Sequence, residues 1–335
     1  MKKIIYTLLL LGVYSSAIAQ TNSQIKKNID LLLIAEQQQE AITFLYQIIQ
    51  QNPKALVSYS KELSNNLNQA LQTGEFNYAL ANLALETSAS STFQLSPASE
   101  KVLSKQNESI RQKLKQTDSY HNWIWEDEAY MMGRAESGLI LDLLGYGTSQ
   151  TSLEELKASL DYFTDNRPKY FAVAALLRRS GQVNTKHYQS LAKDDETRGL
   201  LYMQLKNLNK LSLFPEAYHT QIQLSKADMV NWLIYPTELN TFPTEIELVK
   251  MFTIEYSDVG PADFYLWKFR ADNENWKNDG WMAGLSGPFV RANGPSMDAY
   301  GYTFSAFTAF DKKSPEEHFD EIVNIIEEWN AKNKK

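Results

Sequence analysis

The strongest constraint on the fold is a helical pattern of apolar residues over residues 24–200. Glycine and proline are sparse in this stretch, and apolar residues recur three and four positions apart, which is the spacing of one helix face. One such stripe contains Leu63, Leu67 and Leu71, and Ser96-Pro97 combines an N-cap residue with a first-turn proline. The pattern therefore predicts a mainly α fold for more than half of the chain.

The pattern changes after Pro215 and predicts a small α+β region over residues 215–335. Apolar residues alternate from Ile246 to Tyr256, with one lapse at Lys250, and residues 265–270 alternate in the same way. The link at residues 257–261 suits a hairpin turn, and the glycine-rich stretch 280–288 is interpreted as holding a third strand. Residues 314–317, Ser-Pro-Glu-Glu, predict the start of a final helix.

The first nineteen residues predict export through the Sec pathway. Lys2 and Lys3 precede an apolar stretch at residues 4–13, and Ala17-Ile18-Ala19 predicts cleavage before Gln20. The apolar stretch is too short to span a bilayer stably, so we expect a periplasmic or extracellular chain with no transmembrane segment after cleavage. The predicted organisation is a signal peptide at 1–19, a helical region at 20–118, helical pairs at 119–214 and an α+β region at 215–335.

Charge and cysteine content exclude several classes of protein. The net charge is −7, and it becomes −9 without residues 1–19, which carry two basic residues and no acidic one. This charge argues against a nucleic-acid partner, because phosphate binding needs clustered Lys and Arg. The chain has no cysteine, which excludes a thiol nucleophile, a cysteine-ligated zinc or iron–sulfur site and an N-terminal lipid on cysteine.

The helical pairs carry a partial internal repeat. At an offset of 30 residues, the apolar positions of 170–175 fall on those of 200–205, and an acidic turn with an arginine precedes both helices. In residues 153–181 and 188–211, with 128–147 as part of an earlier unit, the chain resembles the HEAT repeat family. That resemblance implies an irregular α-solenoid with an extended binding surface, and the alternative is a helical domain without a true repeat. Residues 232–289 look similar to a region of exported HEAT-like bacterial proteins, which implies no activity.

An aromatic cluster near the C-terminus is the candidate ligand site. Aromatic faces beside polar side chains can bind sugar rings or peptides, because the ring stacks on the ligand while the polar groups orient it. The alternative, which we favour, is that these rings fill the core beneath a short sheet and pin a loop. The speculative ligand-binding residues are Trp267, Trp276, Asp279 and Trp281.

No motif predicts catalysis. The acidic run Glu126-Asp127-Glu128 lies between aromatic residues, as glycosidase carboxylates often do, but neighbouring residues on a helix do not face each other. Acidic residues at a helix start are also favoured by the helix dipole. The four histidines lack metal-ligand spacing, and the oxygen-rich stretch 272–279 does not match a calcium loop. We therefore predict no catalytic residue, no metal and no cofactor.

The leading hypothesis is a non-enzymatic exported protein that binds a protein partner along its helical array. A carbohydrate- or peptide-binding module that uses the C-terminal aromatics is the alternative. A hydrolase that uses Glu126 or Asp127 is the third hypothesis.

Overall fold

A computed structural model describes most of the chain, and it is mainly helical with a small C-terminal sheet, as the sequence predicts. The described residues are 22–52, 54–73, 76–87, 93–114, 127–179, 181–235, 242–257, 260–271, 280–291, 297–299, 301 and 306–333. The predicted signal peptide at 1–19 lies outside them. The chain divides into two compact units, and this division passes through the predicted stretch 119–214. Unit 1 comprises Met1–Lys113, Glu136–Ser159 and Arg178–Ser180, and unit 2 comprises Leu114–Ala135, Leu160–Leu177 and Gly181–Lys335.

The helices that begin unit 1 follow the predicted stripes. Residues 22–31 are helical, and they precede α2 (Ala35–Gln51), the short 3-10 turn η1 (Val57–Tyr59), α3 (Ser60–Gln72), α4 (Tyr78–Glu86) and α5 (Pro97–Lys113). Leu63, Leu67 and Leu71 are all buried on one face of α3. The predicted start at Ser96-Pro97 is confirmed, because the Ser96 hydroxyl accepts a 3.1 Å hydrogen bond from the Ser99 amide in the first turn of α5.

Three helices contribute residues to both units, and the helices and strands that follow them along the chain belong to unit 2. The three are α6 (Glu128–Leu144), α7 (Gln150–Tyr162) and α8 (Asn166–Arg178). Unit 2 continues with α9 (Thr185–Lys193), α10 (Asp195–Asn207), η3 (Leu211–Leu213), η4 (Glu216–Tyr218), α11 (Gln221–Ile234) and α12 (Pro315–Asn333). Helix α10 packs against both α9 and α11. The carboxylate of Asp194 caps α10, accepting from the amides of Glu196 at 2.8 Å and Thr197 at 3.3 Å.

The sheet of unit 2 is antiparallel throughout, with the strand order β1-β2-β3-β4. The strands are β1 (Glu245–Tyr256), β2 (Gly260–Arg270), β3 (Met282–Val290) and β4 (Phe307–Ala309). The predicted hairpin and the predicted third strand are therefore both confirmed. A three-residue fourth strand was not anticipated, because so short a run gives no alternation to recognise.

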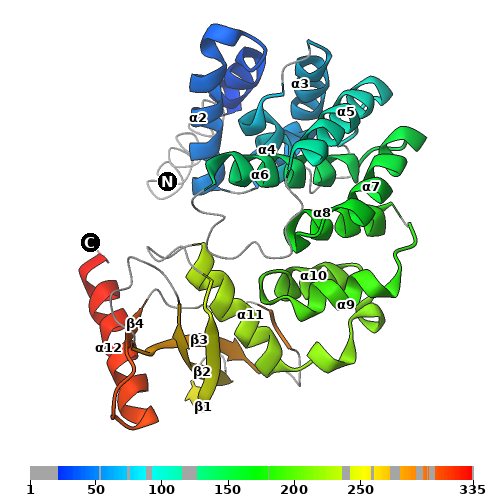
Figure 1. Cartoon of the computed structure of the whole chain (residues 1–335). Coiled ribbons are helices and arrows are strands. Elements are labelled where there is room, and N and C mark those ends of the chain that lie inside the picture. Colours follow the sequence, from blue (N-terminus) through cyan, green and yellow to red (C-terminus); the bar gives the residue numbers. More distant parts are fainter. Residues whose placement is uncertain are drawn as a thin grey trace, which may run out of the picture. The chain divides into compact units, whose positions relative to one another are not determined.

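A helix covers each face of the sheet, as Figure 1 shows for α11 and α12. On the α11 side, Tyr265, Trp267 and Phe269 of β2 pack with Met229 and Trp232. On the α12 side, the alternate residues of β2 pack with a second apolar cluster that includes Phe264, Leu266, Phe319, Ile322 and Ile326. Strand β2 is buried on both sides, and this explains why its sequence is apolar at nearly every position.

The lapse at Lys250 corresponds to an irregularity in the pairing of β1. The register of β1 against β2 shifts between Leu248 and Lys250. Ile246 packs with the cluster on the α11 side, whereas Phe252 and Ile254 pack on the α12 side. The extra residue therefore exchanges the faces of the strand, and it leaves Leu248 exposed.

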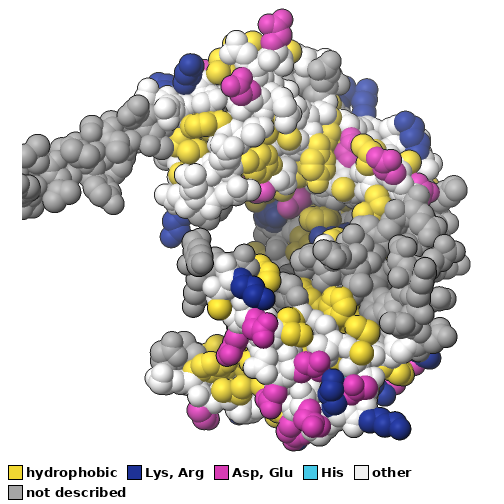
Figure 2. All heavy atoms as spheres, turned by 90° about the vertical axis from the view of Figure 1, so that its left-hand side faces the viewer, with side chains coloured by type: hydrophobic (Ala, Val, Ile, Leu, Met, Phe, Trp, Pro, Cys, Tyr) yellow, Lys and Arg dark blue, Asp and Glu magenta, His cyan; other side chains and the backbone are white. Residues whose placement is uncertain are grey.

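Helix α12 has an apolar inner stripe and an acidic outer surface. Phe319, Ile322 and Ile326 face the sheet, and the helix also carries six carboxylates. Figure 2 shows acidic side chains gathered on the lower part of the view, where α12 lies. Across the described ranges, no helix combines the length and the apolar character needed to cross a membrane.

Gly287 in β3 provides a test of the sheet core. Its φ is +129°, and a Cβ there would lie 2.7 Å from the carbonyl oxygen of Asp263 on β2. We expect Gly287→Ala to lower the free energy of unfolding by at least about 2 kcal/mol, because it combines an unfavourable φ with a backbone clash. Chemical denaturation measures this, with Gly280→Ala as the control, since a Cβ at Gly280 meets no described residue within 4 Å. Equal stabilities of the two variants would contradict the prediction.

Candidate functional site

The predicted aromatic site does not form a single surface around Trp267. This side chain is only 3% exposed and packs with Met229, Leu233 and Phe269 beneath α11. Its indole nitrogen has no hydrogen-bond partner among the described residues. Trp267 is therefore a core residue that a ligand cannot reach, which corrects that part of the prediction and agrees with the core interpretation.

Trp281 lies on the opposite side of the sheet, at the start of β3. Its ring is half-buried, with the Lys268 ammonium 4.4 Å and the Arg270 guanidinium carbon 5.2 Å from the ring centroid. Both cations also pair with carboxylates of β1, Lys268 with Glu247 at 2.9 Å and Arg270 with Glu245. These cation–π contacts cover the ring face that a sugar would need. Trp276 and Asp279 lie outside the described residues, so their ligand-binding role stays a prediction.

The acidic run before α6 has a local structural role at Asp127. Its carboxylate accepts a 2.9 Å hydrogen bond from the amide of Tyr130, as an N-cap residue does. Glu126 lies outside the described residues, so the hydrolase hypothesis stays untested. In the part of the chain that the structure describes, no three His, Asp or Glu side chains are grouped to hold a metal ion.

The most developed polar cluster of unit 2 surrounds Arg134 of α6. The guanidinium is 5% exposed and donates to Asp165 through Nε at 2.7 Å and Nη2 at 3.3 Å. Nη2 also donates to Glu196 at 2.6 Å, and Nη1 donates to the Tyr235 hydroxyl at 3.3 Å. The Tyr130 hydroxyl donates to Asp165 at 2.9 Å. One cation thus holds two buried carboxylates from the beginnings of α8 and α10.

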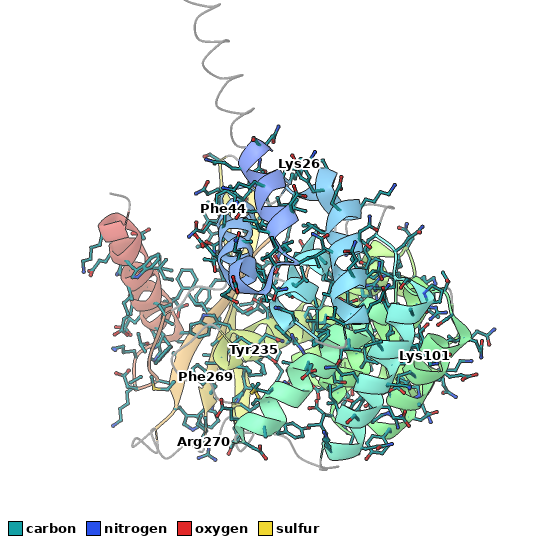
Figure 3. All side chains as sticks on the ribbon, turned by 90° about the horizontal axis from the view of Figure 1, so that it is seen from above. Lys26, Phe44, Lys101, Tyr235, Phe269 and Arg270 are labelled. Atoms are coloured by element: carbon teal, nitrogen blue, oxygen red, sulfur yellow. The ribbon has the colours of Figure 1, made fainter. Side chains whose placement is uncertain are left out.

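The protonation states of this cluster follow from its geometry. Burial opposes the charge on Arg134, but the carboxylates of Glu196 and Asp165 outweigh it and raise the pKa of Arg134. Burial, followed by the charge of Glu196, raises the pKa of Tyr235 to about 12, although its ring is 39% exposed. Tyr235, labelled in Figure 3, donates its hydroxyl hydrogen to Glu196. The Tyr235 hydroxyl therefore remains a protonated hydrogen-bond donor at neutral pH.

A cleft of about 510 Å³ lies beside this cluster, between the start of α10, helix α11 and β1. Its apolar residues include Val230, Phe242 and Ile246. Its charged residues are five acids and two lysines: Asp194, Asp195, Glu196, Glu245, Glu247, Lys193 and Lys226. Lys226 pairs with Asp195 at 3.0 Å. The cleft is therefore net acidic around an apolar patch, and its size is that of a ligand site.

Sequence reasoning missed this cleft. The acidic turn at residues 194–196 was visible as a feature that precedes a repeated helix, but nothing local linked it to β1. Phe242 and Glu247 come from a segment more than forty residues further along the chain. The chain matches no protein-family model, and no curated protein or solved structure is significantly similar to it.

Proposed function

We propose that this chain is an exported, non-enzymatic binding protein, and that the acidic cleft of unit 2 holds its partner. Export rests on the signal pattern of residues 1–19. The observation that carries the binding role is the combination of five carboxylates with the apolar residues Val230, Phe242 and Ile246 in one cleft. Such a surface suits a protein segment that presents Lys or Arg beside an apolar side chain.

The chemistry around the cleft favours binding over catalysis. Glu196 is fixed by Arg134 and Tyr235, and Asp194 is used as the cap of α10. Both carboxylates therefore hold helix ends in place. Glu245 and Glu247 lie on the rim, where they are about half exposed and can reach an approaching cation. An ionised carboxylate accepts more than one hydrogen bond, so its present partner does not exclude a second.

The helices that support the cleft are consistent with a solenoid. Asn166 at the start of α8 donates to Asp194 before α10 at 2.8 Å, and so links the beginnings of two successive second helices. Tandem helical pairs joined in this way would present their ends along one surface. We propose an irregular HEAT-like array for this part, with a helical domain lacking true repeats as the alternative.

The test measures the affinity of purified protein for short synthetic peptides. Peptides with Lys or Arg beside Leu or Phe are compared with counterparts in which the cation is replaced by Glu. We expect the basic peptides to bind preferentially and to weaken as salt is added. We expect Glu247→Lys to lower their affinity about tenfold or more, because it places a like charge at the rim.

Glu255→Lys is the matched control, because Glu255 lies on the same strand but does not line the cleft. It should leave the affinity within about twofold of wild type, which corresponds to less than about 0.5 kcal/mol. Equal loss in the two variants, or no preference for basic over acidic peptides, would refute the acidic cleft as the binding site.

A further inference from the structure

Unit 1 contains a second concave surface, a groove of about 720 Å³ lined by residues of α2, α3 and α4 and by the segments before α2 and α4. None of the ten lining residues that the structure describes is charged, although 22% of the whole chain is charged. The lining includes two aromatic rings, Phe76 and Tyr78, and the Tyr78 side chain is 48% exposed. An uncharged lining gives no attraction to an ionic ligand, so the groove suits a neutral one.

The polar side chains of the groove are held in fixed positions. Gln38 donates through Nε2 to the Leu32 carbonyl at 2.7 Å and accepts from Asn77 Nδ2 at 2.6 Å. Asn77 in turn caps α4, accepting from the Leu80 amide at 2.9 Å. Each of these amide nitrogens carries two hydrogens and uses one of them in these bonds. No acceptor for the second hydrogens lies among the described residues, so two oriented donors remain beside the aromatic rings.

The form of the groove favours a sugar over a peptide. A peptide anchor needs a well-packed, desolvated hole, yet every lining residue of this groove is at least partly exposed. The lining helices already use their backbone groups internally, so they offer no edge to an extended chain. A sugar ring requires an exposed aromatic face and a few oriented polar groups, which Tyr78, Gln38 and Asn77 supply.

We propose that the groove between α2, α3 and α4 binds a neutral oligosaccharide, with the sugar stacked on Tyr78 and its hydroxyls bonded to Gln38 and Asn77. Gln69 and Thr73 lie at the same groove and add uncharged polar contacts. This site is in unit 1 and is independent of the acidic cleft of unit 2.

The test titrates the full mature chain with a panel of neutral oligosaccharides of different linkage, alongside charged oligosaccharides and neutral peptides, by calorimetry. We expect at least one neutral oligosaccharide to bind saturably and Tyr78→Ala to weaken it about tenfold. Tyr78→Phe should retain binding, because the ring and not the hydroxyl makes the stacking contact. Tyr256→Ala is the matched control, since Tyr256 is 40% exposed on β1 and lies outside the groove.

Three outcomes would overturn the proposal: no saturable binding of any neutral oligosaccharide, equal loss in Tyr78→Ala and Tyr256→Ala, or Tyr78-dependent binding of peptides or charged sugars instead. Chemical denaturation confirms that the variants are folded, as expected for a substitution at an exposed first-turn residue of α4. Glu247→Lys should leave sugar binding unchanged, so the acidic cleft and this groove are tested separately.

Discussion

Replacing Arg134 with methionine should lower the free energy of unfolding of unit 2 by about 3–5 kcal/mol, the largest single effect expected in this protein. The substitution keeps an unbranched side chain of similar length but removes the cation that pairs with both Asp165 and Glu196. Glu196 then keeps the Arg167 guanidinium, which lies further away at 3.8 Å. Both carboxylates are less than 5% exposed, so water cannot replace the lost partner. Urea denaturation monitored by tryptophan fluorescence measures the change.

A second variant separates lost charge pairing from lost packing. Adding Glu196→Gln to Arg134→Met removes one uncompensated buried charge, so we expect part of the stability to return. Arg270→Met is the control, because Arg270 and Glu245 are both about 45% exposed and such surface pairs contribute less than about 1 kcal/mol. If the double variant is no more stable than Arg134→Met, the loss arises from packing and the prediction is wrong.

Replacing Glu100 with alanine should destabilise unit 1 by about 3 kcal/mol, because several buried donors lose their acceptor together. The Glu100 carboxylate is fully buried and accepts from the amides of Thr148 at 3.0 Å and Ser149 at 2.8 Å. The hydroxyls of Ser149 at 2.5 Å and Ser152 at 2.6 Å donate to it as well. Glu100 of α5 therefore holds the segment before α7 in place, where the Ser149 hydroxyl caps the helix by accepting from the Ser152 amide at 3.2 Å.

The effect of Glu100 should depend on pH in a defined direction. Burial would raise the pKa of Glu100, but the hydrogen bonds from Ser149, Ser152 and Thr148 outweigh it and hold the pKa below its ordinary value of 4.5. A lowered pKa means that the stabilisation is complete above 4.5 and is lost as the pH falls through the folded-state value. The stability difference between wild type and Glu100→Ala should therefore shrink as the pH falls from 7 to 3. Glu40→Ala, at an exposed position of α2, is the control for the size of the effect and should change the free energy of unfolding by less than about 0.5 kcal/mol.

The local elements of the fold were predictable because their signals lie within a few residues. The stripe through Leu63, Leu67 and Leu71 identifies α3, and Ser96-Pro97 locates the start of α5. The alternation in β2 identified a strand, and the sequence predicted at least one covering helix, where the structure has two. The lapse at Lys250 was visible, but its consequence was not, because a bulge is defined only against the partner strand.

The candidate sites were much less predictable. Trp267 and Trp281 are fourteen residues apart and both aromatic, yet pairing in the sheet places one against α11 and the other beneath Lys268 and Arg270. The strand period gives each side chain a face, but it does not say which face is covered. In the same way, the uncharged groove depends on Gln38 of α2 meeting Asn77, which is 39 residues away.

The longer helices and strands can be located from local patterns, because periodicity and capping act between neighbours along the chain. The contacts of Arg134 with Asp165, Glu196 and Tyr235 depend instead on long-range packing, because these partners are 31, 62 and 101 residues further along the chain. In the local sequence, an acidic residue at a helix start that pairs with a distant arginine cannot be told apart from one that does not. Its partner is selected by the packing of helices that are distant in sequence, and that packing reflects the burial of many apolar faces at once.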